Sequence, residues 1–156
     1  MVVSSSDYPV GFYFSLSFEG EELGFQEVSG ISKEYGIEEV RSGGENRFKY
    51  RLPTLTTSKN LVLKRAIVPE NSKLIKWCED SLDQGLSGPI KTENVSVNLL
   101  NSDGETLIQW NFHKAYPVKY SVSDLHSQKN ELAMETLELA YTYFEVVQKN
   151  ADHSQE

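Results

Sequence analysis

The chain has 156 residues, of which 38% are hydrophobic, 11% aromatic and 24% charged, a composition that excludes disordered and collagenous chains and fits one folded domain. Acidic residues outnumber basic ones 23 to 15, and the formal net charge of −8 argues against nucleic acid as a ligand. A single cysteine, Cys78, cannot form an internal disulfide, and no segment has the pattern of a transmembrane span or a signal peptide, so we expect folding in a cytoplasm without membrane insertion.

Alternation of apolar and polar residues predicts strands in the first half of the chain. Residues 12–18 place Phe12, Phe14, Leu16 and Phe18 on one face and Tyr13, Ser15 and Ser17 on the other, the period-two pattern of a half-buried strand. Residues 24–28 predict the return strand of a hairpin. Further strands are expected at 32–41, 48–52 and 61–67, with a glycine-rich loop at 42–46 and a polar connection at 53–60.

One helix is predicted next, because Asn71 or Ser72 can cap it, the apolar residues that follow share one arc at 100° per residue, and Gly85 can end it. Residues 94–99 and 106–115 alternate on either side of a turn at 101–104 and predict a second hairpin. The expected core combines the apolar faces of these elements: Phe12, Phe14, Leu16, Leu63, Trp77, Cys78, Val97, Leu99, Trp110 and Phe112.

The last third of the chain is harder to assign. Tyr116 and Pro117 are expected to bend the chain before 118–122 continues the strand. Residues 132–144 contain good helix formers, but their period-two alternation and their Tyr and Thr content favour one long terminal strand. We expect a frayed tail at 149–156.

No pattern of catalytic or metal-binding residues is present in the sequence. The three histidines and Cys78 lack the close spacing of a metal site, and Ser123 to His126 lacks the strand-to-helix setting of a catalytic serine. Ser42 to Gly44 lacks the spacing of a phosphate-binding loop. We therefore expect no enzymatic activity, no cofactor and no metal, and a function carried by the surface, above all by strand edges that can pair with another chain.

Six segments resemble, in order along the chain, the inner tube proteins of contractile phage tails and of phage tail-like injection systems. They are Tyr8–Phe12, Gly24–Gly30, Val40–Gly44, Asn60–Arg65, Trp110–Tyr120 and Asn130–Tyr141. Departures are small: Ala66 stands where a glycine is common, and Tyr116 where a tryptophan is common. The resemblance implies a mainly β fold, a β-sandwich or barrel-like tail-tube domain spanning 1–156, with a flexible arm at 1–10 and one flanking helix at about 71–84.

The resemblance also implies a structural function. Protomers would form hexameric rings that stack into a rigid inner tube, through which a cargo effector is delivered when the surrounding sheath protein contracts. Baseplate, spike and cap proteins would be further partners, in a particle assembled in the bacterial cytoplasm and then released or anchored to a membrane. The alternative is a secreted hexameric ring of the type VI secretion kind that carries effectors, and a third hypothesis is a monomeric β-sandwich that binds carbohydrate or peptide.

Candidate site residues follow from the same resemblance. Contacts between stacked rings are expected from the arm at 3–10 and from two loops, with Arg41, Ser42, Gly43, Gly44, Glu45, Asn46 and Arg47 in the first and Pro53, Thr54, Ser58 and Asn60 in the second. Tyr35, Glu39 and Arg41 are candidates for lining the lumen, because a water-filled bore tolerates a strand that is polar on both faces. A hexamer would carry about −48 formal charges, and an acidic bore would repel a polyanion.

Overall fold

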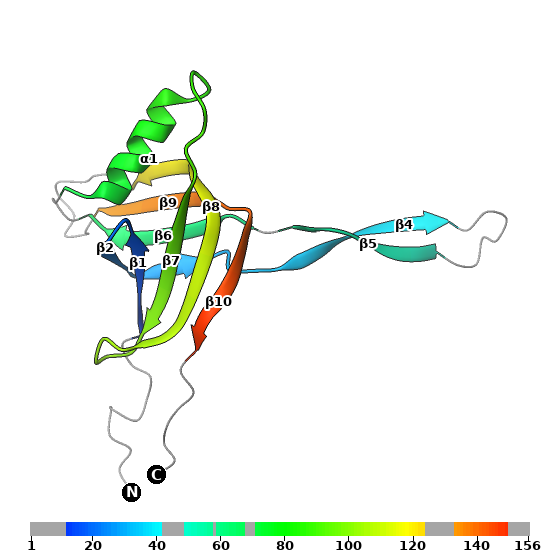
Figure 1. Ribbon diagram of the computed structural model, residues 1–156, viewed down its shortest axis with the longest axis horizontal. Helices are drawn as coiled ribbons and strands as arrows, with labels where there is room; N and C mark the ends of the chain where they lie inside the picture. Colours follow the sequence, from blue (N-terminus) through cyan, green and yellow to red (C-terminus); the bar gives the residue numbers. More distant parts are fainter. Residues whose placement is uncertain (1–11, 42–48, 58, 68–70, 124–132, 150–156) are drawn as a thin grey trace, which may run out of the picture.

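The computed structural model describes residues 12–41, 49–57, 59–67, 71–123 and 133–149. These residues form ten strands and one helix (Figure 1). In chain order the elements are β1 (Tyr13–Phe18), β2 (Glu21–Phe25), β3 (Glu27–Ser29), β4 (Glu34–Arg41), β5 (Lys49–Thr57), β6 (Leu61–Ala66), α1 (Lys73–Gln84), β7 (Glu93–Leu100), β8 (Thr106–Val122), β9 (Met134–Ala140) and β10 (Tyr143–Lys149).

Eight of the strands form one antiparallel sheet that folds over into two layers. The first layer contains β2, β1, β7, the first half of β8 and β10, and the second contains the other half of β8 with β9, β6 and β3. Strands of the second layer run across those of the first (Figure 1). Because β8 belongs to both layers, the fold is a sandwich that is partly closed into a barrel, as the sequence predicts.

The turn of β8 between the layers falls at Lys114, two residues before pairing with β9 begins at Tyr116. Ala115 still pairs with β7, whereas Tyr116 already pairs with β9. Lys114 adopts a left-handed φ of 54°, and its backbone N–H donates to Asn94 Oδ1 at 3.1 Å, which compensates for the interrupted ladder. A bend is therefore present, but at Lys114 and not at the predicted Tyr116 and Pro117, through which β8 continues as one strand.

The hydrophobic core lies between the two layers and under the helix. On β6 and β9 every second residue is buried, and Trp77 of α1 stacks on Phe18 with ring centroids 5.0 Å apart. Of the predicted core residues, six are buried and two more, Phe14 and Trp110, pack partly buried against them; the six are Leu16, Leu63, Trp77, Cys78, Val97 and Phe112.

Two core predictions are wrong. Phe12 is 46% exposed, and Leu99 is only partly buried and lies outside the core cluster. Both residues lie at the end of the first layer where β7 and β8 extend past the second layer (Figure 1). Alternation identifies the face of a strand but does not show how far the opposite layer reaches.

The helix prediction is confirmed with its caps. Ser72 accepts a hydrogen bond from the Ile75 backbone N–H through Oγ at 3.3 Å, and Gly85 ends the helix with a φ of 57°. The carboxylate of Glu21 also accepts from the Lys73 backbone N–H at 2.7 Å. This acidic group satisfies a free N–H at the positive end of the helix dipole and ties α1 to β2.

Three strand predictions need correction. Residues 53–57 are not a loop but continue β5, in which Pro53 pairs with Ile37 of β4. Among the described strands β5 pairs only with β4, and such an edge position tolerates a proline. The return strand is divided between β2 in one layer and β3 in the other. The long terminal strand is two strands, β9 and β10, separated at Tyr141 and Thr142, and β10 reaches Lys149 while 150–156 lie outside the described residues.

Cys78 is fully buried beneath α1. Burial, followed by the nearby charge of Glu135, raises the pKa of its thiol from 9.0 to about 12. Only the thiolate is nucleophilic, so we expect a disulfide reagent at pH 8 to react with the folded chain at least about 100-fold more slowly than with the urea-unfolded chain. The reaction is followed by absorbance, and equal reaction rates in the folded and unfolded chains would contradict the burial of Cys78.

Candidate assembly surface

The strands β4 and β5 form a two-stranded ribbon that projects away from the body (Figure 1). Their register runs from Glu34 opposite Thr57 to Arg41 opposite Lys49. The ribbon leaves the body next to Gly30, which has a φ of +92° and at which a Cβ would lie 1.9 Å from the Asn60 carbonyl oxygen. An isolated two-stranded ribbon is marginally stable in water, which makes this element a candidate for contact with another surface.

Five of the thirteen candidate site residues lie on the two strands of the ribbon. Tyr35, Glu39 and Arg41 lie on β4, and Pro53 and Thr54 on β5. Asn60 is exposed at the base of the ribbon, immediately before β6. The remaining candidates, Ser42, Gly43, Gly44, Glu45, Asn46, Arg47 and Ser58, lie outside the described residues, as does the arm at 3–10. The assigned roles of all these residues stay predictions.

A second candidate assembly surface, which sequence reasoning missed, is the outer edge of β10. This strand pairs with β8 on one side, and among the described strands none pairs with its other side. Tyr143, Val146 and Val147 on it are 51%, 53% and 54% exposed, and a β-bulge interrupts the register between Val146 and Gln148. Apolar edge strands left open in a monomer are pairing sites for another chain.

The outward face of the first layer is a third distinctive surface. We define the polar face as eleven outward-facing residues, each of which alternates with core residues of β1, β2, β7, β8 or β10: Tyr13, Ser15, Ser17, Glu22, Ser96, Asn98, Gln109, Asn111, His113, Tyr143 and Glu145. No lysine or arginine stands among them. The alternation of Asn94, Ser96 and Asn98 with apolar residues already indicated a neutral polar face in the sequence. Such a face alone does not indicate a functional role.

Hydrogen bonds connect the side chains of the polar face across neighbouring strands. On the β1 side, Asn98 Nδ2 donates to both Ser15 Oγ and Ser17 Oγ at 3.2 Å, and Ser15 Oγ donates to Glu22 Oε1 at 2.7 Å. Cross-strand pairs of this kind contribute to sheet stability and fix side-chain positions.

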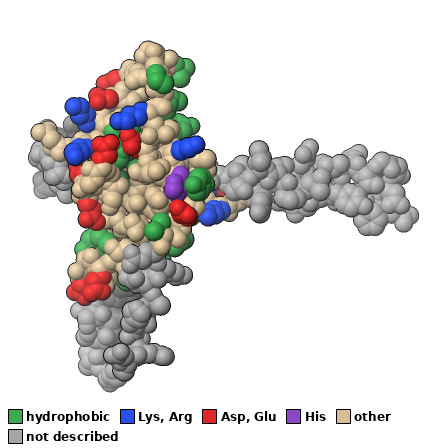
Figure 2. Space-filling view, in the orientation of Figure 1, with side chains coloured by type: hydrophobic (Ala, Val, Ile, Leu, Met, Phe, Trp, Pro, Cys, Tyr) green, Lys and Arg blue, Asp and Glu red, His purple; other side chains and the backbone are tan. Residues whose placement is uncertain are grey.

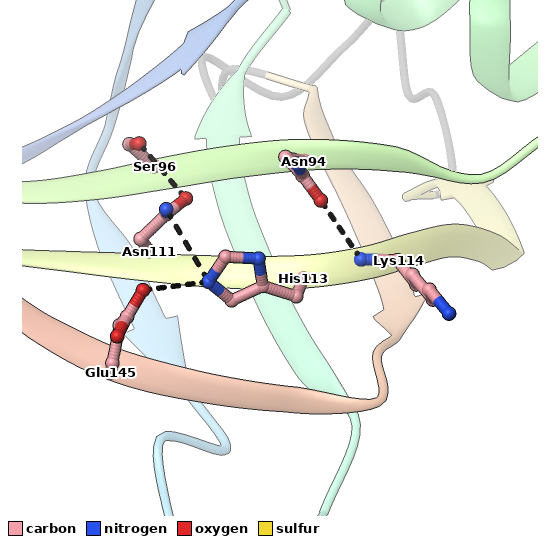
Figure 3. A network of polar contacts seen from close by, with 6 residues as sticks. All are labelled: Asn94, Ser96, Asn111, His113, Lys114 and Glu145. Carbon is pink, nitrogen blue, oxygen red and sulfur yellow. Dashed lines mark hydrogen bonds and ion pairs between the residues drawn. The ribbon is translucent and has the colours of Figure 1, made fainter.

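On the β10 side the connections continue through His113 (Figure 3). Its Nε2 lies 2.8 Å from Glu145 Oε1 and 3.5 Å from Asn111 Nδ2, and Asn111 Oδ1 in turn lies 3.5 Å from Ser96 Oγ. A carboxylate only accepts hydrogen bonds, so the short contact requires that Nε2 carries the proton and donates to Glu145. Asn111 Nδ2 is itself a donor, so its 3.5 Å approach to Nε2 is a packing contact and not a hydrogen bond. The imidazole also stacks on Tyr143, with ring centroids 4.3 Å apart.

One polar cluster is buried inside the barrel. Arg65 of β6 and Glu135 of β9 form an ion pair through Nε and Oε1, with 6% and 5% of the two residues exposed. Tyr120 of β8 donates its hydroxyl to Glu135 Oε2 at 2.8 Å, and the Arg65 guanidinium lies over the Phe25 ring. The cluster connects three strands of the second layer.

Burial, and then the hydrogen bond to Glu135, raises the pKa of Tyr120 from 10.0 to about 12. As the pH rises, the Tyr120 hydroxyl would lose its proton in the unfolded chain before it does so in the folded chain. Titration of this group therefore leaves the free energy of unfolding unchanged below about pH 10 and lowers it as the pH rises from about 10 to about 12. We expect Tyr120→Phe to flatten that part of the profile of unfolding free energy against pH, and an unchanged slope in urea titrations would contradict the assignment.

No helix in the described part of the chain is long and apolar enough to span a membrane. The structural features that remain are a partly closed antiparallel barrel, an open apolar strand edge, a charge-poor outer sheet face and a projecting ribbon. Together they define the class of structural proteins that assemble through their strands.

The family follows from the sequence comparison. The sequence profile of the family described as T4-like virus tail tube protein gp19 matches residues 10–145, so the chain belongs to this family and is a tube subunit of a contractile injection system. No curated protein is significantly similar in sequence.

Solved structures show the same fold. A chain in the cryo-EM structure of the anti-feeding prophage baseplate is 25% identical, with a TM-score of 0.71 over 94% of this chain and 97% of that one. A chain in the sheath-tube complex of the extracellular contractile injection system PVC is 23% identical, with a TM-score of 0.70 over 94% and 100%. Hcp1 from Flavobacterium johnsoniae is 20% identical, with a TM-score of 0.56 over 87% and 95%.

Proposed function

We propose that this chain forms hexameric rings that stack into the inner tube of a phage tail-like particle. The observation that carries the proposal is the open edge of β10 with its exposed Tyr143, Val146 and Val147. Adding a strand of the next copy to this edge would bury these side chains, and closing the ring would leave no open edge. The anti-feeding prophage baseplate structure, which contains a similar chain, was symmetrised six-fold, and this supports the choice of six copies.

The polar face is our candidate for the wall of the bore. Joining first layers edge to edge would place one face of each toward the axis, and only this face combines a polar surface with few charges. Its Ser and Asn side chains already bond one another, so few free donors remain to hold a passing molecule. Glu22 and Glu145 would make the wall mildly acidic. The prediction that Tyr35, Glu39 and Arg41 line the lumen is the competing assignment.

The ribbon of β4 and β5, with the predicted residues at 41–47 and 53–60, is our candidate for contacts between stacked rings. A projecting element gains stability only by docking, and the next ring would offer a surface of the same chain. Sheath, baseplate, spike and cap proteins would be the other partners, a cargo effector would pass through the bore, and the particle would assemble in a bacterial cytoplasm. In this proposal the chain acts structurally and not as an enzyme.

A secreted ring of the type VI kind is the second candidate function, and the fold shared with Hcp1 favours it. Both functions predict rings. They differ in stacking, because a tube subunit should form long tubes and a carrier ring should remain separate.

Negative-stain electron microscopy across a concentration series, paired with solution mass, tests the proposal. We expect hollow rings or tubes and a mass that rises in steps of six 17.7 kDa protomers. A 17.7 kDa monomer at every concentration, also after addition of baseplate particles as a template, would overturn it. Rings that never stack would favour the carrier function.

A further inference from the structure

The strand β10 is held to the body by a single neighbour. Only β8 pairs with it among the described strands, in a register that places Tyr143 opposite His113 and Glu145 opposite Asn111. On its core side Phe144 packs on Phe112 with ring centroids 5.3 Å apart, and it also contacts the Tyr141 ring and the Lys33 ammonium group. An edge strand that pairs on one side only opens locally more readily than a central strand.

On the outward side, one residue of β8 contacts two residues of β10. The His113 ring stacks on Tyr143 with an angle of 14° between the planes, and its Nε2 donates to Glu145 Oε1 at 2.8 Å. Tyr143 and Glu145 are two positions apart on the same face of β10, so the imidazole contacts both ends of this segment. Figure 3 shows the contact with Glu145, and Asn111 Nδ2 lies 3.5 Å from the same ring nitrogen.

These contacts have a consequence for association. A strand that is already ordered can accept a partner strand without a further loss of conformational entropy, whereas a strand that opens locally must be ordered at the expense of binding free energy. His113 lies on the outer face, not in the core, so its contacts are more important for the position of β10 than for the packing of the barrel.

We propose that His113 is a positioning residue for assembly, which fixes β10 through Tyr143 and Glu145 so that the outer edge of β10 is ready to receive the next copy. This inference rests on the proposed function, because it takes the β10 edge to be the assembly edge. The inference goes beyond the proposed function because His113 is not on the open edge itself and acts through two side chains of β10.

Four variants test the inference. His113→Ala removes the stacking and the hydrogen bond, His113→Phe keeps the stacking alone, and Glu145→Gln keeps an acceptor for the Nε2 proton. Ser17→Ala is the matched control, because Ser17 lies on the same face but on β1, where it contacts Asn98 and not β10. Amide hydrogen exchange of residues 143–149 reports the order of β10, and sedimentation reports ring formation.

We expect His113→Ala to increase exchange in β10 by at least about tenfold and to weaken ring formation by a similar factor, while the amides of β6 and β9 keep their protection. His113→Phe should give an intermediate effect, and Glu145→Gln and Ser17→Ala should resemble the wild-type chain. Wild-type protection of β10 in His113→Ala, or lost protection with unchanged ring formation, would overturn the inference. If the wild-type chain forms no rings, the proposed function fails first, and exchange alone then shows whether His113 orders β10.

Discussion

Val146→Lys combined with Val147→Lys is expected to abolish ring formation and to leave the protomer folded. Both valines are more than half exposed on the open edge of β10, so lysines there remain solvated in the monomer. In a ring the same ammonium groups would be covered by the adjacent copy, and burying an unpaired charge costs several kcal/mol. We expect association to weaken by at least about 100-fold, which corresponds to about 2.7 kcal/mol.

Sedimentation and negative-stain microscopy provide the measurement, and the far-ultraviolet spectrum with the thermal midpoint provides the check on folding. Leu82→Lys is the matched control, since Leu82 is an exposed apolar residue of α1, far from β10 in the fold. Rings of normal stability in the double variant would show that β10 is not the assembly edge. Loss of rings in Leu82→Lys as well would show that the effect of added lysine is not specific to β10.

Local sequence patterns predicted most of the individual elements. Strand alternation and the capping residues of α1 depend on neighbours in the chain, so β1, β6, β7 and the helix are confirmed within a few residues. The corner between β9 and β10 was missed, because Tyr141 and Thr142 continue the same alternation while the chain changes layers. That change is fixed by distant contacts, the Thr142 N–H donating to the His113 carbonyl at 3.0 Å and the Tyr141 hydroxyl to the Gly30 carbonyl at 3.0 Å.

The assembly surfaces were predicted only in part, for a related reason. Residues of the ribbon could be proposed from the sequence because they are contiguous and resemble a family. The β10 edge and the polar face are defined by which strands lie beside one another, and that order, β2-β1-β7-β8 with β10 beside β8, is not encoded in any single segment. His113 and Glu145 are 32 residues apart in the chain and become neighbours only through the register.

Glu135→Ala is expected to cause the largest loss of stability of any single variant considered. It would leave the buried Arg65 guanidinium without its carboxylate and the Tyr120 hydroxyl without its acceptor. Removing one member of a buried ion pair costs about 3–5 kcal/mol, because the remaining charge is not solvated. The loss is measured by urea unfolding, with Glu135→Ala introduced into the Val146→Lys and Val147→Lys double variant, which is expected to stay monomeric. A urea midpoint that does not depend on protein concentration shows that monomers are being compared.

Two further variants separate the lost charge pair from the lost volume. Glu135→Gln keeps one of the two acceptor oxygens and should cost less than Glu135→Ala. Arg65→Met combined with Glu135→Leu should recover most of the stability because neither buried charge remains at this site. A loss below about 1 kcal/mol for Glu135→Ala would mean that water solvates Arg65 in the folded chain. If the Arg65→Met and Glu135→Leu double variant is as unstable as Glu135→Ala, the cluster stabilises the fold through specific hydrogen bonds among β6, β8 and β9. Apolar packing cannot replace those hydrogen bonds.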